Sequence, residues 1–203
     1  PLGCPEPHYK GVERYVTLAR VETDDGIVGW GECISQFPES AKATKVVIEE
    51  GYSPLLVGED PYDVERLWHK MLDRTWWYGP QGIAAFGISA VDMALWDLKG
   101  KLLNLPVCKL IGGKLVNKVS AMASIIFDME DLDWTVNEFS WMREQGYRVV
   151  KGGWGMRPEA VFGLDQNRDR ELVRRIRETI GDEIELVIDM PGMWGIWDVQ
   201  TAI

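Results

Sequence analysis

The second half of the chain alternates short apolar runs with longer amphipathic segments, and this order leaves few possible folds. The apolar runs are predicted to be strands and the amphipathic segments helices, with short connections between them. The predicted strands span residues 118–126, 147–154 and 184–190, and the predicted helices span residues 132–146, 164–181 and 197–203. This order is typical of a parallel sheet with right-handed crossovers.

The first half has a different organisation. Residues 14–33 are predicted to form a β-hairpin around the turn sequence TDDG. Three helical patterns follow, at residues 41–56, at residues 58–72 with Asp60-Pro61 as the start, and at residues 84–105, where Pro106 ends the helix. The change of rhythm near Gly112 and Gly113 predicts a domain boundary, with residues 1–113 in one domain and residues 114–203 in the other.

The charge balance and the cysteines narrow the possible partners and compartments. The chain carries 32 acidic and 22 basic residues, a net charge of −10, which argues against nucleic acid or an anionic membrane as the main partner. Three widely spaced cysteines, Cys4, Cys33 and Cys108, have neither metal-ligand nor disulfide-framework spacing and favour a reducing, cytoplasmic location. The chain has no apolar run near the ~20 residues of a membrane span.

Two predicted strands end in a single charge that is followed closely by glycine or proline. Lys151 is followed by Gly152 and Gly153, and Asp189 closes the run IELVID. Ligands of parallel α/β folds bind at the carboxyl ends of the strands, so both charges belong to the expected ligand-binding edge. The glycines are expected where a ligand or another backbone comes close. The alternative interpretation is that both residues are ordinary solvated strand ends.

A nucleotide-binding loop is excluded for residues 152–155. The stretch GGWG has glycines around Trp154, but it lacks G-x-G-x-x-G spacing before a helix and lacks the following Lys-Ser/Thr.

Two further stretches carry a resemblance to a known family. They are DDGIVGWGE at residues 24–32 and ISAVDMALWDLKGKLLNLPVCKLIGG at residues 88–113. With a lysine at the end of the second barrel strand and an aspartate at the end of the third, the chain resembles the mandelate racemase/muconate lactonizing enzyme branch of the enolase superfamily. The resemblance implies an amino-terminal α+β capping domain followed by the first part of a modified TIM (β/α) barrel.

The resemblance also implies a chemistry. In such enzymes Mg²⁺ holds the carboxylate of an acid substrate while a base removes the proton next to that carboxylate. By position, Asp189 resembles the first of three carboxylate metal ligands, and Lys151 resembles the first lysine of the family's K-x-K motif. Gly153 replaces the second lysine, and Pro191 stands where relatives commonly have Asn. We therefore interpret Lys151 as an electrostatic clamp for the substrate carboxylate rather than as a proton carrier.

Four aromatic or imidazole side chains are candidates for contact with the substrate. Trp76, Trp77 and Tyr78 lie in a glycine-bounded loop that resembles a substrate-covering loop, although aromatics serve interdomain packing equally well. His8 lies in the amino-terminal Pro/Gly segment, which resembles another covering loop, and the alternative is a mobile terminal histidine.

Three other polar residues are interpreted as structural. His69 lies inside a helical pattern. Asp92 and Asp97, in AVDMALWD, resemble paired acids but are expected to hold their helix against the barrel.

The function predicted for the complete enzyme is dehydration of a small carboxylate substrate, a sugar acid. The lost second lysine favours a dehydratase, because a racemase needs two opposed bases. The alternatives are a racemase, epimerase or cycloisomerase of the same superfamily, or a non-catalytic fragment. An open sheet of three strands also predicts association, and hence a homo-oligomer.

Overall fold

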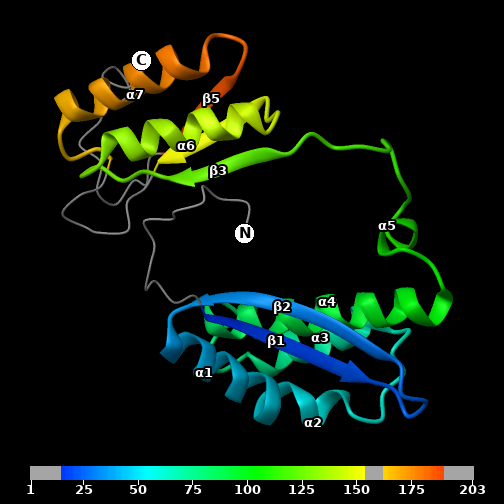
Figure 1. The fold of residues 1–203 in the computed structure, drawn as a ribbon. Helices are drawn as coiled ribbons and strands as arrows, with labels where there is room; N and C mark the ends of the chain where they lie inside the picture. Colours follow the sequence, from blue (N-terminus) through cyan, green and yellow to red (C-terminus); the bar gives the residue numbers. More distant parts are fainter. Residues whose placement is uncertain (1–14, 154–161, 190–203) are drawn as a thin grey trace. The chain divides into compact units, whose positions relative to one another are not determined.

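The computed structural model describes residues 15–153 and 162–189. In it the described residues form two compact units, the first from residues 15–117 and the second from residues 118–153 and 162–189 (Figure 1). Each unit has a hydrophobic core of its own, and each is described by itself below.

The first unit begins with the predicted hairpin. Strand β1 (Tyr15–Glu22) pairs antiparallel with β2 (Val28–Gln36). Thr23 closes the turn by donating its N–H to the carbonyl of Ile27 at 3.0 Å. Burial alternates along both strands, so one face of the hairpin packs against helices while the other stays exposed. A groove of about 810 Å³ follows the edge of β1 that β2 leaves unpaired.

Six helical elements follow the hairpin. They are α1 (Pro38–Val46), the π-helix η1 (Val47–Tyr52), α2 (Ser53–Leu56), α3 (Val64–Arg74), α4 (Ile83–Leu103) and α5 (Val107–Leu110). The single helix expected over residues 41–56 is therefore interrupted by a π turn. That turn carries Tyr52 into the core, where its ring packs on Gly87 of α4 and its hydroxyl donates to the carbonyl of Ala84 at 3.0 Å.

The start of α3 differs from the prediction. The helix begins at Val64 rather than at Asp60-Pro61. The Asp60 carboxylate accepts the N–H of Tyr62 at 2.8 Å, which makes a local turn there instead of the first helical turn.

The glycines of the GWGE sequence allow α4 to lie very close to β2. A Cβ atom at Gly31 would sit 2.0 Å from the carbonyl oxygen of Ala90, and one at Gly29 would sit 2.1 Å from that of Ala94. Because no side chain fits at these two positions, the strand can rest directly on the small-residue face of the helix.

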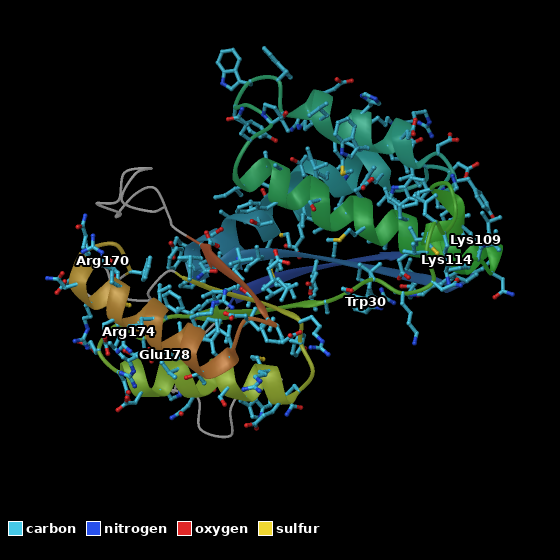
Figure 2. All side chains as sticks on the ribbon, turned by 90° about the horizontal axis from the view of Figure 1, so that it is seen from above. Trp30, Lys109, Lys114, Arg170, Arg174 and Glu178 are labelled. Carbon is cyan, nitrogen blue, oxygen red and sulfur yellow. The ribbon has the colours of Figure 1, made fainter. Side chains whose placement is uncertain are left out.

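Asp97 also joins α4 to β2. Its carboxylate accepts the backbone N–H of Trp30 at 2.8 Å and the ammonium of Lys101 at 2.6 Å, and Lys101 also donates to the carbonyl of Val28. Trp30 lies on the strand (Figure 2). Asp97 thus holds the helix against β2 of the capping unit, and its expected role against the barrel stays a prediction.

The second unit is a parallel three-stranded sheet with two helices. Its elements are β3 (Met122–Ile126), α6 (Leu132–Glu144), β4 (Val149–Gly153), α7 (Gln166–Ile180) and β5 (Glu185–Asp189). The strands lie in the order β3-β4-β5, as the alternation predicts. One face of the sheet, represented by Ile125 and Val150, forms a buried core with Phe139 of α6 and Ile176 of α7.

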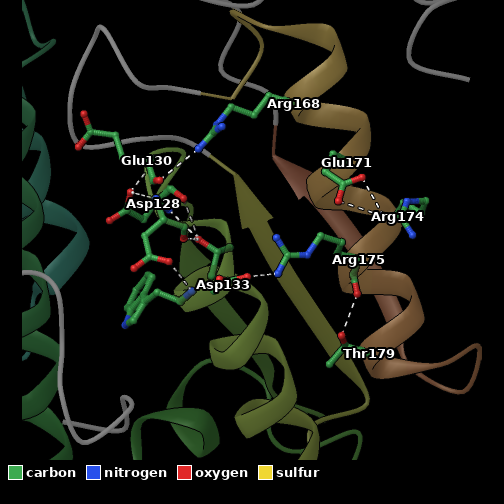
Figure 3. A network of polar contacts seen from close by, with 11 residues as sticks. Asp128, Glu130, Asp133, Arg168, Glu171, Arg174, Arg175 and Thr179 are labelled. Carbon is green, nitrogen blue, oxygen red and sulfur yellow. Dashed lines mark hydrogen bonds and ion pairs between the residues drawn. The ribbon is translucent and has the colours of Figure 1, made fainter.

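Polar contacts also cap and join the two helices of this unit. Asp131 caps α6 by accepting the N–H of Trp134, and Arg175 of α7 forms an ion pair with Asp133 of α6 (Figure 3). On the exposed side of α7, Arg174 pairs with Glu171 (Figure 3) and with Glu178, and Figure 2 labels both Arg174 and Glu178 on this helix. Exposed pairs of this kind contribute little to stability, so the buried core determines how the helices lie.

Across residues 15–153 and 162–189, no helix has both the length and the apolar character needed to cross a bilayer.

Candidate active site

Lys151 and Asp189 meet at the carboxyl ends of two neighbouring parallel strands. Lys151 lies near the end of β4 and Asp189 is the last residue of β5. The Nζ atom of Lys151 lies 2.9 Å from Oδ2 of Asp189, as a salt bridge with hydrogen-bond geometry. The side chains are 28% and 36% exposed, so the pair is accessible to a ligand. The sequence predicts that two strands direct charges to one place, and the structure brings these two charges together.

The sheet register explains why the two side chains share a face. Lys151 is paired with Val187, and Asp189 is paired with Gly153, two residues further along β4. Residues two apart in a strand point to the same face, so Lys151 and Asp189 lie on one face and Lys151 reaches diagonally across to β5. Val150, on the opposite face, is buried in the core with the helices. The charged pair therefore lies on the face of the sheet that the helices leave uncovered.

Different neighbours explain the two glycines after Lys151. A Cβ atom at Gly153 would lie 2.0 Å from the carbonyl oxygen of Asp189, and Gly153 has a φ of +151°. A Cβ atom at Gly152 would lie 2.1 Å from the ring of Phe127 and 2.6 Å from that of Phe139. The backbone of β5 approaches one glycine and core aromatics approach the other. The position of the family's second lysine thus has no room for a side chain.

Sequence reasoning missed one residue of this face. Ser124 of β3 is the register partner of Lys151, and its side chain is exposed. It therefore shares a face with Lys151 and Asp189 on the neighbouring strand. The alternation of residues 118–126 contained this signal, but it could be read only once the register of β3 against β4 was known.

The predicted aromatic loop lies in the capping unit. Trp76 and Trp77 are 77% and 80% exposed and contact each other edge to face, with ring centroids 5.2 Å apart. Tyr78 is half exposed and interacts with Tyr52, whose pKa is raised strongly, first by burial and then by the neighbouring Tyr78. His8 lies outside the described residues. The roles of these four residues in substrate binding stay predictions.

The three polar residues interpreted as structural also lie on helices of the capping unit. His69 of α3 contacts the ring of Trp68 edge to face at 5.0 Å between centroids. Burial raises the pKa of Asp92, on α4. Burial would also raise the pKa of Asp97, but the hydrogen bonds from Lys101 and from the Trp30 N–H outweigh it and lower that pKa.

The described residues do not offer a complete set of metal ligands. In this part of the chain, no three His, Cys, Asp or Glu side chains gather closely enough to hold a metal ion. Asp189 nevertheless has the chemistry of a Mg²⁺ ligand, because it is a carboxylate on an open face that already attracts a cation, the ammonium of Lys151. The residue fits a partial metal site, to which other groups must contribute.

Comparison with known proteins decides the family. A sequence model described as "Mandelate racemase / muconate lactonizing enzyme, N-terminal domain" matches residues 8–112, which is more than half of the chain. The chain belongs to the mandelate racemase/muconate lactonizing enzyme family.

The proteins similar to this chain are named for several different enzymatic reactions. Arabinonate dehydratase of Saccharolobus solfataricus is 34% identical over 176 residues, covering 86% of this chain and 44% of that protein. D-galactarolactone cycloisomerase of Agrobacterium fabrum is 31% identical over 172 residues, covering 85% of this chain and 43% of that protein. The crystal structure of a racemase from Streptomyces coelicolor A3(2) with bound magnesium is also similar, with 28% sequence identity and a TM-score of 0.81. The match covers 95% of this chain and 54% of the racemase chain.

These matches confirm the predicted family and fold class. The chain consists of an enolase-superfamily capping domain and a partial, barrel-like parallel sheet. It spans about half the length of the relatives that it matches. The family is one of enzymes, and a related structure contains magnesium.

Proposed function

We propose that this chain supplies the capping domain, residues 1–113, and the first three β/α units, residues 114–203, of a Mg²⁺-dependent enzyme that removes a proton next to a carboxylate. The observation that carries the proposal is the convergence of Lys151 and Asp189, 2.9 Å apart, on the uncovered face at the carboxyl ends of β4 and β5. A cation and a carboxylate at this edge are the two groups that a metal-bound acid substrate requires.

Each residue has one role in the proposed reaction. Asp189 provides one of the oxygen ligands of Mg²⁺, and the ion, when bound, stabilises the negative charge that develops on the substrate carboxylate. Lys151 donates hydrogen bonds to the same carboxylate and fixes its orientation. Its partner in the K-x-K spacing is Gly153, so these strands supply one lysine rather than two. The main base must come from barrel strands outside residues 1–203.

Within this chemistry we favour an acid-sugar dehydratase, which expels a β-hydroxyl as water. A racemase requires bases on both sides of the reacting carbon, and position 153 cannot hold one of them, because a Cβ there would overlap the Asp189 carbonyl. An arabinonate dehydratase among the relatives supports a sugar acid as substrate. The second candidate is a cycloisomerase, which the D-galactarolactone cycloisomerase relative favours.

We also propose how the substrate is covered. Trp76 and Trp77 expose large aromatic faces that can close over a sugar acid, with Tyr78 and His8 contributing polar groups. Interdomain packing is the competing role of the three aromatic residues. Substitution of Trp77 by Ala distinguishes the two, because loss of a substrate contact raises KM, whereas loss of packing lowers the midpoint of thermal unfolding.

The reaction is tested with the complete enzyme, meaning residues 1–203 together with the barrel strands that the relatives possess, against a panel of sugar acids with Mg²⁺. Lys151→Ala and Asp189→Asn should each lower kcat/KM at least ~100-fold, while Lys114→Ala, an exposed control (Figure 2), should leave it unchanged. Unchanged activity in either site variant would refute the assignment.

The 203-residue chain alone should have no appreciable activity. Its described residues offer one recognisable metal carboxylate, Asp189, and a single carboxylate is a poor Mg²⁺ site without further ligands. Turnover on the order of 1 per second by this chain, abolished by Lys151→Ala, would show that Lys151 itself is the base.

A further inference from the structure

We propose that Arg168 is a positioning residue for the candidate active site. It holds the loop at residues 127–131, which joins β3 to α6, against the strand end that carries Lys151. The inference rests on the proposed role of Lys151 in substrate binding, and it adds a residue of α7 that acts on Lys151 through this loop.

The guanidinium of Arg168 fastens the loop at two points. Its Nε donates to the carbonyl of Met129 at 2.5 Å, and its Nη2 donates to the carbonyl of Glu130 at 3.1 Å (Figure 3). Arg168 lies in the first turn of α7, where the carboxylate of Asp165 accepts its backbone N–H at 3.1 Å. A guanidinium presents its donors in a rigid fork, so it fixes two neighbouring carbonyls in one geometry, whereas a lysine ammonium is a point charge on a flexible stem.

The start of the same loop contacts the strand end directly. The N–H of Phe127 donates to the carbonyl of Gly153 at 3.0 Å. The ring of Phe127 packs on Gly152, where an added Cβ would lie 2.1 Å from it, and it contacts the ring of Phe162 with centroids 5.3 Å apart. Phe127 therefore supports, from the core side of the sheet, the two residues that follow Lys151.

Internal hydrogen bonds connect the two ends of the loop. The carboxylate of Asp128 accepts the N–H groups of Glu130 and Asp131 at 2.9 and 3.0 Å. The N–H of Asp128 donates to the hydroxyl of Thr135 on α6 at 2.9 Å. Because these bonds close the loop on itself and on the helix, a displacement of its last carbonyls reaches its first residue.

Loss of the two hydrogen bonds of Arg168 should loosen the strand end without unfolding the unit. Arg168 is exposed, and the core around Val150 and Ile176 is formed by other side chains. With the loop released, the ammonium of Lys151 would be less well placed for a substrate carboxylate. Such a loss of positioning raises KM, whereas a partly unfolded enzyme has less active protein with an unchanged KM.

Amide hydrogen exchange of the 203-residue chain tests the contact. Arg168→Ala should raise the exchange rate of the Phe127 amide on the order of tenfold, because local opening no longer has to break the two hydrogen bonds to the loop. Arg168→Lys keeps the charge but loses the fork, and it should exchange nearly as fast. Arg174→Ala, on the exposed side of the same helix, is the control and should stay within about twofold.

Two further measurements keep the test decisive. The amide of Val150, in the core, should exchange at the same rate in all these variants, which shows that the unit remains folded. In the complete enzyme with a sugar acid, Arg168→Ala and Arg168→Lys should raise KM on the order of tenfold and lower kcat less, while Arg174→Ala should change neither.

The outcomes separate this inference from the proposed function. If Arg168→Ala leaves the exchange of Phe127 unchanged, or if Arg168→Lys restores it, the inference is refuted. It is also refuted if an enzyme that requires Lys151 keeps its KM in both Arg168 variants. If Lys151→Ala leaves the activity unchanged, the proposed function is wrong and the positioning role fails with it.

Discussion

Substitution of Gly153 by alanine should disrupt the end of the sheet that carries the candidate site. The added Cβ would lie 2.0 Å from the carbonyl oxygen of Asp189, whereas ordinary contacts begin at 3.4 Å, so β4 and β5 must separate by about 1.4 Å. That shift affects the pairing with Asp189 and the hydrogen bond that the N–H of Phe127 donates to the Gly153 carbonyl. The positive φ of +151° adds backbone strain to the steric overlap.

The expected loss can be estimated from these contributions. Two backbone hydrogen bonds are worth ~0.5–1.5 kcal/mol each, and a backbone held in this glycine-only region of φ costs a residue with a Cβ roughly 1–3 kcal/mol. The free energy of unfolding of the three-stranded unit should therefore fall by about 4 kcal/mol, a large part of a typical ~5–15 kcal/mol. Gly153→Lys, which restores the K-x-K spacing, should cost at least as much and should not create a racemase.

The assay is urea unfolding followed through the amide signals of Val150 and Ile176, which belong to the core of this unit and report on it separately from the capping unit. Gly181→Ala is the matched control, because Gly181 also has a positive φ, +72°, but has open space around it. The control should lose only its backbone strain, about 2 kcal/mol. If Gly153→Ala unfolds within about 1 kcal/mol of the control, close backbone contact does not explain the glycine, and position 153 could hold a lysine.

Three further substitutions test the capping unit. Gly31→Ala should destabilise it by at least ~3 kcal/mol in thermal or urea unfolding, because the added Cβ would lie 2.0 Å from the Ala90 carbonyl oxygen. Gly51→Ala, which adds a Cβ in open space, should be neutral. Equal effects of the two substitutions would contradict the packing argument. Tyr52→Phe should cost about 1 kcal/mol through loss of the hydrogen bond to Ala84, and an unchanged unfolding midpoint would disprove it. Asp97→Ala should cost about 1 kcal/mol at pH 7, an effect reduced by the exposure of the carboxylate. The pKa of Asp97 is lower in the folded state than in the unfolded state. The stabilisation by Asp97 is therefore present above its unfolded pKa of ~3.9 and is lost as the pH falls through its folded pKa. If the difference in unfolding free energy between Asp97→Ala and the unaltered chain persists at lower pH, the assignment is contradicted.

The sequence alone was sufficient for elements whose signals are local. A strand period, a helix period and the turn residues lie within a few positions of one another, so the hairpin, the long helix α4 and the three parallel strands could be read directly. The carboxyl ends of those strands identified Lys151 and Asp189 as neighbours in a possible site, because every parallel strand ends at the same edge of its sheet.

Features that depend on partners distant in the sequence could not be read in this way. Asp97 binds the backbone of Trp30, 67 residues away. No local sequence pattern showed whether Asp97 would bind this strand or the barrel. The π turn at Tyr52 likewise depends on the packing of its ring on Gly87 of another helix.

The register of the sheet decided the rest of the candidate site. A shift of one residue would turn every side chain of a strand to the other face, and nothing within a single strand specifies its register against a neighbour. Only the tertiary structure places Asp189 opposite Gly153, so that Lys151 reaches the carboxylate diagonally and Ser124 joins the same face. The sequence determined which residues end the strands, and the packing of strand against strand determined which of them meet, because that packing depends on side chains contributed by distant parts of the chain.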